Sequence, residues 1–289
     1  MNLRDIPVVT VGPGSQPEET DAAQLEYIAL PTEMSRYTMP DTPEPEDVAG
    51  LNGAREAMAW LTDALARYTP GGERLLADVS GLDEESRDLV NQILGEGEVS
   101  IRYAGDFRAQ IQESVMAGVW RSFYMDNDDR VTHDLIEVAD VPCLVRLPAA
   151  EVLTPAALAR VETPWESMNG PAILTEIAEH ASKRTAGSLP HVINLSLLPL
   201  SDADLAYLDS ALGLGPVSIL SRGYGNCEVR STRLRDVWWV RYFNSMHKLI
   251  LNSIEIIDVP AVACAAPDDI SDTRDRLADI LEPYWVDVA

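Results

Sequence analysis

Cysteine is scarce in this chain of 289 residues, and the three that occur, Cys143, Cys227 and Cys264, are widely spaced with no C-x-x-C pair. Such an odd and scattered set predicts neither a disulfide framework nor a zinc site. No run of apolar residues approaches the roughly 18 needed to span a bilayer. Residues 1–14 also lack the charged-then-apolar order of a signal peptide. These absences together predict a cytoplasmic protein.

Basic residues are few as well, because 22 lysines and arginines face 47 aspartates and glutamates, which leaves a formal net charge of −25. A surface this acidic repels phosphate groups, which excludes nucleic acid as an expected partner. It also argues against docking on anionic lipid. Solubility alone explains the charge most simply, and a basic protein partner is the alternative.

Catalytic motifs are absent from the sequence. It holds no G-x-S-x-G, no Walker loop and no kinase signature, and no histidine stands in H-E-x-x-H or at ligand spacing from a cysteine. His180 follows Glu176 and Glu179 on a predicted helix, and this pattern is more typical of a solvated surface than of a metal site. We therefore expect no enzyme, no metal and no cofactor. The four histidines are His133, His180, His191 and His247.

The chain repeats itself at an offset of 118 residues. Residues 94–101 align with residues 212–219, and residues 140–142 align with residues 258–260. Between residues 82 and 142, sixteen of 61 gapless positions are identical to their counterparts. We therefore predict an α+β fold of two tandem homologous repeats, each with helices packed on a mainly antiparallel sheet, related by a pseudo-two-fold axis.

Composition sets the expected boundaries. Residues 1–50 hold seven prolines and ten acidic residues, and such a segment buries too little apolar area to offset its ordering entropy, so we expect it to be partly flexible. Residues 51–146 form the first repeat, and a proline-containing linker, residues 147–167, follows it. Residues 168–289 form the second repeat, and a helix from residue 270 to residue 281 closes it.

Within each repeat the pattern predicts a helix, a strand, a second helix and then an antiparallel meander. Asn169 is the expected N-cap of the first helix in the second copy. Ser201 and Asp204 resemble a capping box for the next helix, and Gly213 should end it. The expected strands of that copy are residues 192–198, 217–221, 227–232, 237–243 and 249–256.

Two segments of the second repeat are candidate partner-binding sites. The first is the glycine-rich connection formed by Arg222, Gly223, Tyr224, Gly225, Asn226 and Cys227, which is either a recognition loop or a plain flexible turn. The second is Trp239 with Arg241. Trp238 aligns with Trp120 and is expected in the core, whereas Trp239 aligns with Arg121 and is specific to this copy. We expect Trp239 to be an exposed interface anchor.

Four runs of the second repeat resemble the HupH family of [NiFe] hydrogenase expression proteins, also called HoxQ or HyaF. They are HVINLSLLPL (191–200), ILSRGYGNC (219–227), VWWVRYFN (237–244) and LILNSIE (249–255). The resemblance covers residues 165–282, and the first copy is similar to the family more loosely. Glu228 departs from the pattern, because we expect a basic residue directly after Cys227.

The resemblance implies a non-enzymatic accessory protein for maturation of uptake [NiFe] hydrogenase. Its expected partners are the precursor of the iron–sulfur small subunit, before export through the twin-arginine route, and other hydrogenase accessory proteins. The acidic charge would complement a twin-arginine leader. The alternative is a metal or iron–sulfur cluster carrier in the same pathway, using Cys227 with Cys264 or His191. An enzyme with an unfamiliar site is the third possibility, and the resemblance supplies no catalytic residues for it.

Overall fold

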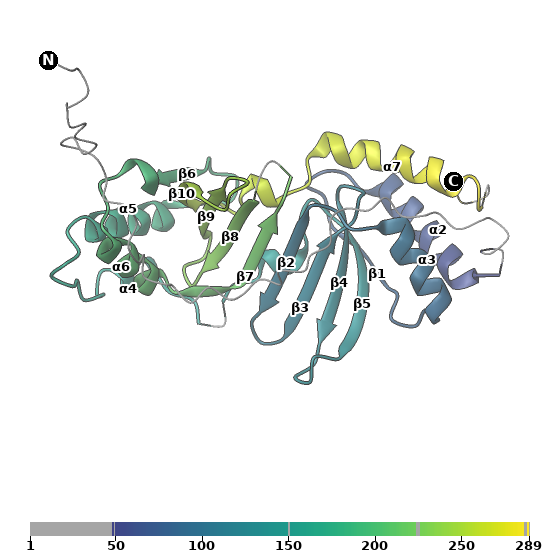
Figure 1. Ribbon diagram of the computed structural model, residues 1–289, viewed down its shortest axis with the longest axis horizontal. Coiled ribbons are helices and arrows are strands. Elements are labelled where there is room, and N and C mark those ends of the chain that lie inside the picture. Colours follow the sequence, from purple (N-terminus) through teal and green to yellow (C-terminus); the bar gives the residue numbers. More distant parts are fainter. Residues whose placement is uncertain (1–47, 49, 150, 224–225, 286–287, 289) are drawn as a thin grey trace, which may run out of the picture. The chain divides into compact units, whose positions relative to one another are not determined.

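One antiparallel sheet of ten strands forms the centre of the computed structural model (Figure 1). The structure describes residue 48, residues 50–149, 151–223 and 226–285, and residue 288. The acidic segment expected at residues 1–50 therefore lies almost wholly outside the described residues. The strand order is β1-β5-β4-β3-β2-β7-β8-β9-β10-β6.

The first repeat supplies α2 (Asn52–Arg67), β1 (Leu75–Asp78), α3 (Glu84–Leu94), β2 (Val99–Ala104), β3 (Arg108–Glu113), β4 (Val119–Met125), β5 (Val131–Val138) and the 3₁₀ turn η1 (Cys143–Arg146). A short helix, α4 (Pro155–Leu158), follows in the linker. The second repeat supplies α5 (Gly170–Lys183), β6 (His191–Asn194), η2 (Leu195–Leu197), α6 (Asp202–Leu212), β7 (Leu214–Ser221), β8 (Asn226–Thr232), β9 (Val237–Phe243), β10 (Leu249–Ile256), η3 (Ala261–Ala263) and α7 (Pro267–Leu281).

The two repeats join edge to edge through β2 and β7. Ile101 pairs with Ile219, its own counterpart in the other repeat, and the pairs on either side are unchanged when the repeats are exchanged. This is the register that a local two-fold axis between Ile101 and Ile219 produces. The expectation of a separate sheet in each repeat is wrong. Pairing β2 with β7 satisfies the backbone groups of two edges that separate sheets would leave open.

Backbone conformation repeats in the same way. Eight described residues have a φ in the left-handed region, and they fall into four matched positions: Gly71 with Gly187, Gly95 with Gly213, Gly118 with Asp236, and Asp129 with His247. The last pair lies in the β4–β5 and β9–β10 hairpin turns. Asp126 and Asn244 open these turns, and each side chain accepts hydrogen bonds from the amides two and four residues further on. These segments are therefore hairpin turns, as the sequence predicts.

Among the described residues, helices cover the two ends of one face of the sheet. α2, α3 and α7 pack over β4 and β5, while α4, α5 and α6 pack over β9, β10 and β6. A third core lies on the opposite face, where η1 and η3 cover the central strands and enclose Trp120, Trp238 and Ile219. Both faces of the sheet are therefore buried over much of their area.

The helix that follows the strands of each repeat packs on the helices of the other repeat. Leu277 and Leu281 of α7 lie in the core formed with α2 and α3, so the closing helix packs on the first repeat (Figure 1). Leu158 of α4 lies in the core formed with α5 and α6. The helices over the first repeat thus include α7 of the second repeat, and the helices over the second repeat include α4 of the linker. Within the described residues, no helix is long and apolar enough to cross a membrane.

Candidate interaction surface

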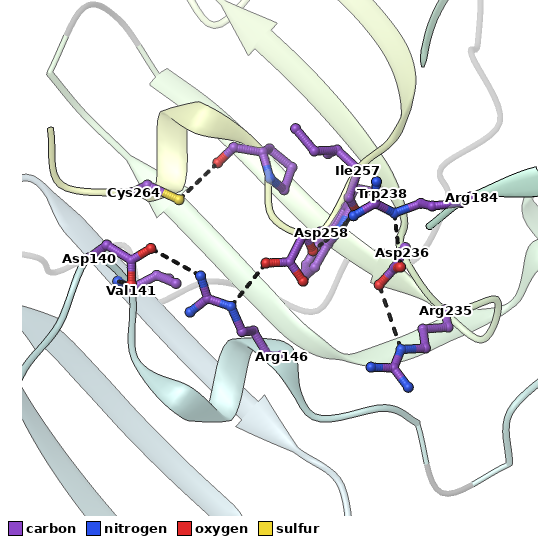
Figure 2. Close-up of polar contacts among 11 residues, drawn as sticks. Asp140, Val141, Arg146, Arg184, Arg235, Asp236, Trp238, Ile257, Asp258 and Cys264 are labelled. Carbon is purple, nitrogen blue, oxygen red and sulfur yellow. Dashed lines mark hydrogen bonds and ion pairs between the residues drawn. The ribbon is translucent and has the colours of Figure 1, made fainter. Parts of the chain in front are cut away.

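A single arginine links the two repeats on the side of η1 and η3 (Figure 2). Arg146 donates hydrogen bonds to Asp140 and Asp258, each at 3.0 Å. These aspartates are equivalent positions of the repeated sequence D-V-P. Partial burial favours a lower pKa for Arg146, but the two carboxylates outweigh it and raise the pKa. The contact therefore holds the two copies together and makes the guanidinium a structural group rather than a free binding group.

The glycine-rich connection lies beside the start of β2. The amide of Arg222 donates to the carbonyl of Glu98 at 3.1 Å, and Gly223 is so close to the Glu98 carboxylate that a Cβ there would lie 2.1 Å from it. Tyr224 and Gly225 lie outside the described residues. Asn226 opens β8. Partner binding by this loop stays a prediction, and its described part is packed against Glu98.

Trp239 is not an exposed anchor, which corrects the expectation from the sequence. Its side chain is only 6% exposed and lies in the core under α5 and α6. The indole Nε1 donates to Asn252 Oδ1 at 2.6 Å. Arg241 is 8% exposed and donates to Glu228 at 3.0 Å, so Glu228, where we expected a basic residue, is the carboxylate partner of a strand neighbour.

The three thiols are held in their protonated form. Burial raises the pKa of Cys227 to about 12 and the pKa of Cys264 to about 11, and burial raises the pKa of Cys143 as well. Cys227 is 1% exposed and faces Tyr242, whose pKa burial raises strongly. Among the described residues, Cys227, Cys264 and His191 do not form a ligand group; the group that does form is Glu176, His180 and His191.

The segments at the start of α5, at η2 and at the start of β10 come together and carry exposed apolar side chains. Asn169 Nδ2 donates to the carbonyl of Pro199 at 2.8 Å, which brings the start of α5 to the segment after η2. Asn252 of β10 donates from its amide to Ser196 of η2 at 2.8 Å. We call the exposed side chains around these contacts the apolar edge: Trp165 (89%), Met168 (85%), Leu197 (79%), Leu198 (40%), Leu249 (43%) and Ile250 (60%).

Two residues of the apolar edge have no apolar counterpart in the first repeat, whereas Val131, which aligns with Leu249, is itself 56% exposed. The pairing of β1 with β5 matches the pairing of β6 with β10, and by that match Gly81 stands where the second repeat has Leu197. Thr132 likewise aligns with Ile250. Surface patches of exposed apolar side chains are a common mark of protein–protein contact sites.

Sequence reasoning missed this surface because it assigned residues 192–198 to one strand. β6 ends at Asn194, whose side chain accepts from the amide of Ser196 and turns the chain into η2. The signal was the run Leu197-Leu198, which breaks the alternation of a half-buried strand.

These features define the class of protein: a duplicated α+β scaffold with an exposed apolar edge. Among the described residues, its thiols are hydrogen-bonded to no histidine. The family model for the HupH hydrogenase expression protein, C-terminal conserved region, matches residues 51–163 and residues 167–284. The hydrogenase expression/formation protein HoxQ of Cupriavidus necator is 45% identical over 286 residues, covering 99% of each chain.

Two further relatives carry the other names of the group. The hydrogenase expression/formation protein HupH of Rhizobium leguminosarum bv. viciae is 42% identical, covering 78% of this chain and 80% of its own. The hydrogenase-1 operon protein HyaF of Escherichia coli is 30% identical, covering 94% of each chain. This chain belongs to the HupH/HoxQ/HyaF family of hydrogenase expression/formation proteins. This membership confirms the resemblance, and the family is one of accessory proteins for hydrogenase expression and formation.

Proposed function

We propose that this protein is a chaperone that binds the precursor of the iron–sulfur small subunit of uptake [NiFe] hydrogenase before its export, and that the apolar edge is the contact surface. The observation that carries the surface assignment is a set of six large apolar side chains, 40–89% exposed, on segments that the Asn169–Pro199 and Asn252–Ser196 hydrogen bonds bring together. The hydrogenase names of the relatives support the identity of the partner.

Charge supports the same partner. The chain carries a formal net charge of −25, and a twin-arginine leader is basic, so long-range attraction would favour their encounter. The apolar edge would supply the lasting contact, because apolar area removed from water contributes most to the strength of a complex. A broad open surface also suits a protein that holds an unfinished subunit and releases it later.

The test is recovery of the small-subunit precursor from cells that express a hydrogenase operon, with the full-length protein as bait. Wild type should recover the precursor with its leader still attached. The double variant Leu197→Ser/Ile250→Thr removes two exposed apolar side chains and moves position 250 to the residue of the first repeat. Recovery should fall on the order of tenfold, which corresponds to about 1.4 kcal/mol of binding free energy.

The matched control is Leu76→Ser/Val131→Thr in the first repeat, where the two side chains are 42% and 56% exposed. This control should recover as much precursor as wild type. Failure of wild type to recover the precursor contradicts the proposed function. Equal recovery by both double variants leaves the chaperone function standing and removes the apolar edge as its surface.

A further inference from the structure

Two imidazoles and one carboxylate converge where α5 ends and β6 begins. One potential ligand atom from each of Glu176, His180 and His191 lies within 4.8 Å of the other two. His191 Nε2 lies 2.8 Å from Glu176 Oε1. The rings of His180 and His191 stack in parallel, with centroids 3.4 Å apart and an interplanar angle of 6°.

The backbone fixes this arrangement from both sides. Glu176 and His180 are four residues apart on α5 and so lie on one helix face. His191 is held by its pairing with Ile256 in β10. The turn between them is tied down because Arg184 Nε donates to Asp236 Oδ2 at 2.9 Å. The two rings lie in parallel planes, so one of them has to turn about its side-chain bonds before both nitrogens can point at one ion.

The donor set selects a class of metal. Imidazole nitrogen with one carboxylate oxygen suits divalent transition metals such as zinc, nickel, copper and iron, whereas calcium and magnesium prefer ligand sets made of oxygen. The site is accessible, because the Glu176 side chain is 45% exposed and that of His191 is 31% exposed. The remaining nearby carboxylate, Glu179, is paired with Lys183, which leaves Glu176 as the carboxylate ligand.

We propose that Glu176, His180 and His191 bind one divalent transition-metal ion, Zn²⁺ or Ni²⁺, at the end of α5. Three protein ligands leave at least one coordination position for water or for a group from a partner. The site belongs to the second repeat, since Ala59 and Asp63 stand at the positions that match Glu176 and His180. This proposal replaces the sequence-based interpretation of these residues as part of a solvated helix face.

The test is calorimetric titration of untagged, EDTA-treated and desalted full-length protein with ZnCl₂ and, separately, with NiCl₂. Wild type should bind one ion per chain in at least one of the two titrations, and the tighter one identifies the preferred metal. The double variant His180→Gln/His191→Gln should lose at least about 100-fold in affinity, since loss of outer hydrogen-bond partners of a ligand already costs 10–100-fold.

The control variant His133→Gln/His247→Asn removes the other two histidines of the chain and should bind as wild type does. Asparagine is used at position 247 because φ there is 59°, a conformation that asparagine tolerates. A second readout is the proton NMR spectrum with Co²⁺, in which the ring signals of His180 and His191 should shift far more than those of His133 and His247.

Three results would overturn the site: no binding by wild type, undiminished binding by the His180→Gln/His191→Gln variant, or an equal loss in the control. Circular dichroism of each variant should match that of wild type, which excludes misfolding as the cause of a loss. The inference does not rest on the proposed chaperone function, because the metal site shares no residue with the apolar edge. A variant that binds no metal should therefore still recover the small-subunit precursor.

Discussion

At one diagonal contact between neighbouring strands, the two repeats place different kinds of side chain. In the first repeat Arg121 of β4 donates two hydrogen bonds to the carboxylate of Asp134 in β5, and the side chains are 7% and 6% exposed. In the second repeat Trp239 and Asn252 occupy those positions, and the contact is one hydrogen bond from the indole. The buried ion pair of the first repeat is therefore replaced in the second repeat by an aromatic ring that is hydrogen-bonded to a neutral amide.

The two repeats thus keep the same contact geometry on this diagonal, but different kinds of interaction stabilise it. An ion pair that has been taken out of water depends on both partners, because either one left alone is an uncompensated buried charge. A tryptophan contributes mostly through its buried area and loses less when its hydrogen-bond partner is removed. The first repeat should therefore be the more fragile to single substitutions on this diagonal.

The largest expected effect is that of Arg121→Trp, which installs the residue of the second repeat without its partner. Asp134 would then be buried and unpaired, and the free energy of unfolding should fall by about 3–5 kcal/mol. The double variant Arg121→Trp/Asp134→Asn installs the full pair of the second repeat and should recover much of that loss. Urea denaturation at pH 7 measures both.

The matching variant in the second repeat is Asn252→Ala, which leaves the indole N–H without its acceptor and should cost about 1–3 kcal/mol. The comparison fails if Arg121→Trp and the double variant lose the same amount. That result would mean that the fit of the tryptophan ring, and not the unpaired carboxylate, causes the loss.

Helix capping shows a second exchange between the copies. In the first repeat Asp83 caps α3 and accepts from the amide and hydroxyl of Ser86. The second repeat reverses the two residue types, because Ser201 is the N-cap of α6 and Asp204 is the carboxylate of the capping box. Asp204 also accepts from Ser167 and from the amides that open α5, so one carboxylate holds the starts of two helices.

We expect Asp204→Ala to lower the free energy of unfolding by about 2–3 kcal/mol at pH 7, because the buried donors around it lose their acceptor. Burial alone would raise the pKa of Asp204, but the hydrogen bonds from Ser201, Gly170 and Ser167 hold it well below its ordinary value of 3.8. A depressed pKa gives stability that is complete above the unfolded value and is lost as the pH falls.

The difference between wild type and Asp204→Ala should therefore be constant from pH 7 to about 5 and shrink below about 4. Urea denaturation over that range measures it. Asp83→Ala is the control, and it should cost less because Asp83 is exposed and caps one helix only. An equal loss from the two variants would contradict the double role of Asp204.

These contacts mark how far the sequence predicts the structure. The strands at residues 237–243 and 249–256, the capping box and the glycine that ends α6 are local signals, and the structure confirms them. Asn169 makes no capping hydrogen bond with its side chain, because Asp204, distant in sequence, accepts from the first amides of α5. Non-local partners of this kind leave no local pattern.

The burial of Trp239 could not be predicted from the sequence, for a related reason. Strand alternation places Trp238 and Trp239 on opposite faces, and the usual inference is that one of them is exposed. Here helices cover one face and the η1 and η3 turns cover the other, so both rings are buried. The joining of β2 to β7, which creates the central face, is equally non-local.

The smallest expected effect concerns a third pair of matched positions. In the second repeat Ser231 accepts a hydrogen bond from the amide of Val217 at 2.9 Å. In the first repeat the matched residue is Glu113, whose carboxylate accepts from the amide of Val99. Burial, with the nearby charges of Glu98 and Asp269, raises the pKa of Glu113 to about 7. The first repeat thus uses an ionisable group where the second uses a neutral one.

A carboxyl group with a raised pKa destabilises the fold where it is charged. Below the unfolded value of 4.5 the group is protonated in both states and costs nothing, and the cost grows as the pH rises towards about 7. Glu113→Gln keeps an acceptor for Val99 and removes the charge. It should raise the free energy of unfolding at pH 8 by an amount of the order of 1 kcal/mol and leave it unchanged at pH 4. Urea denaturation at the two pH values measures this, with the exposed Glu56→Gln as control; a gain of equal size at both pH values would show that packing, and not the charge, distinguishes Glu113 from Ser231.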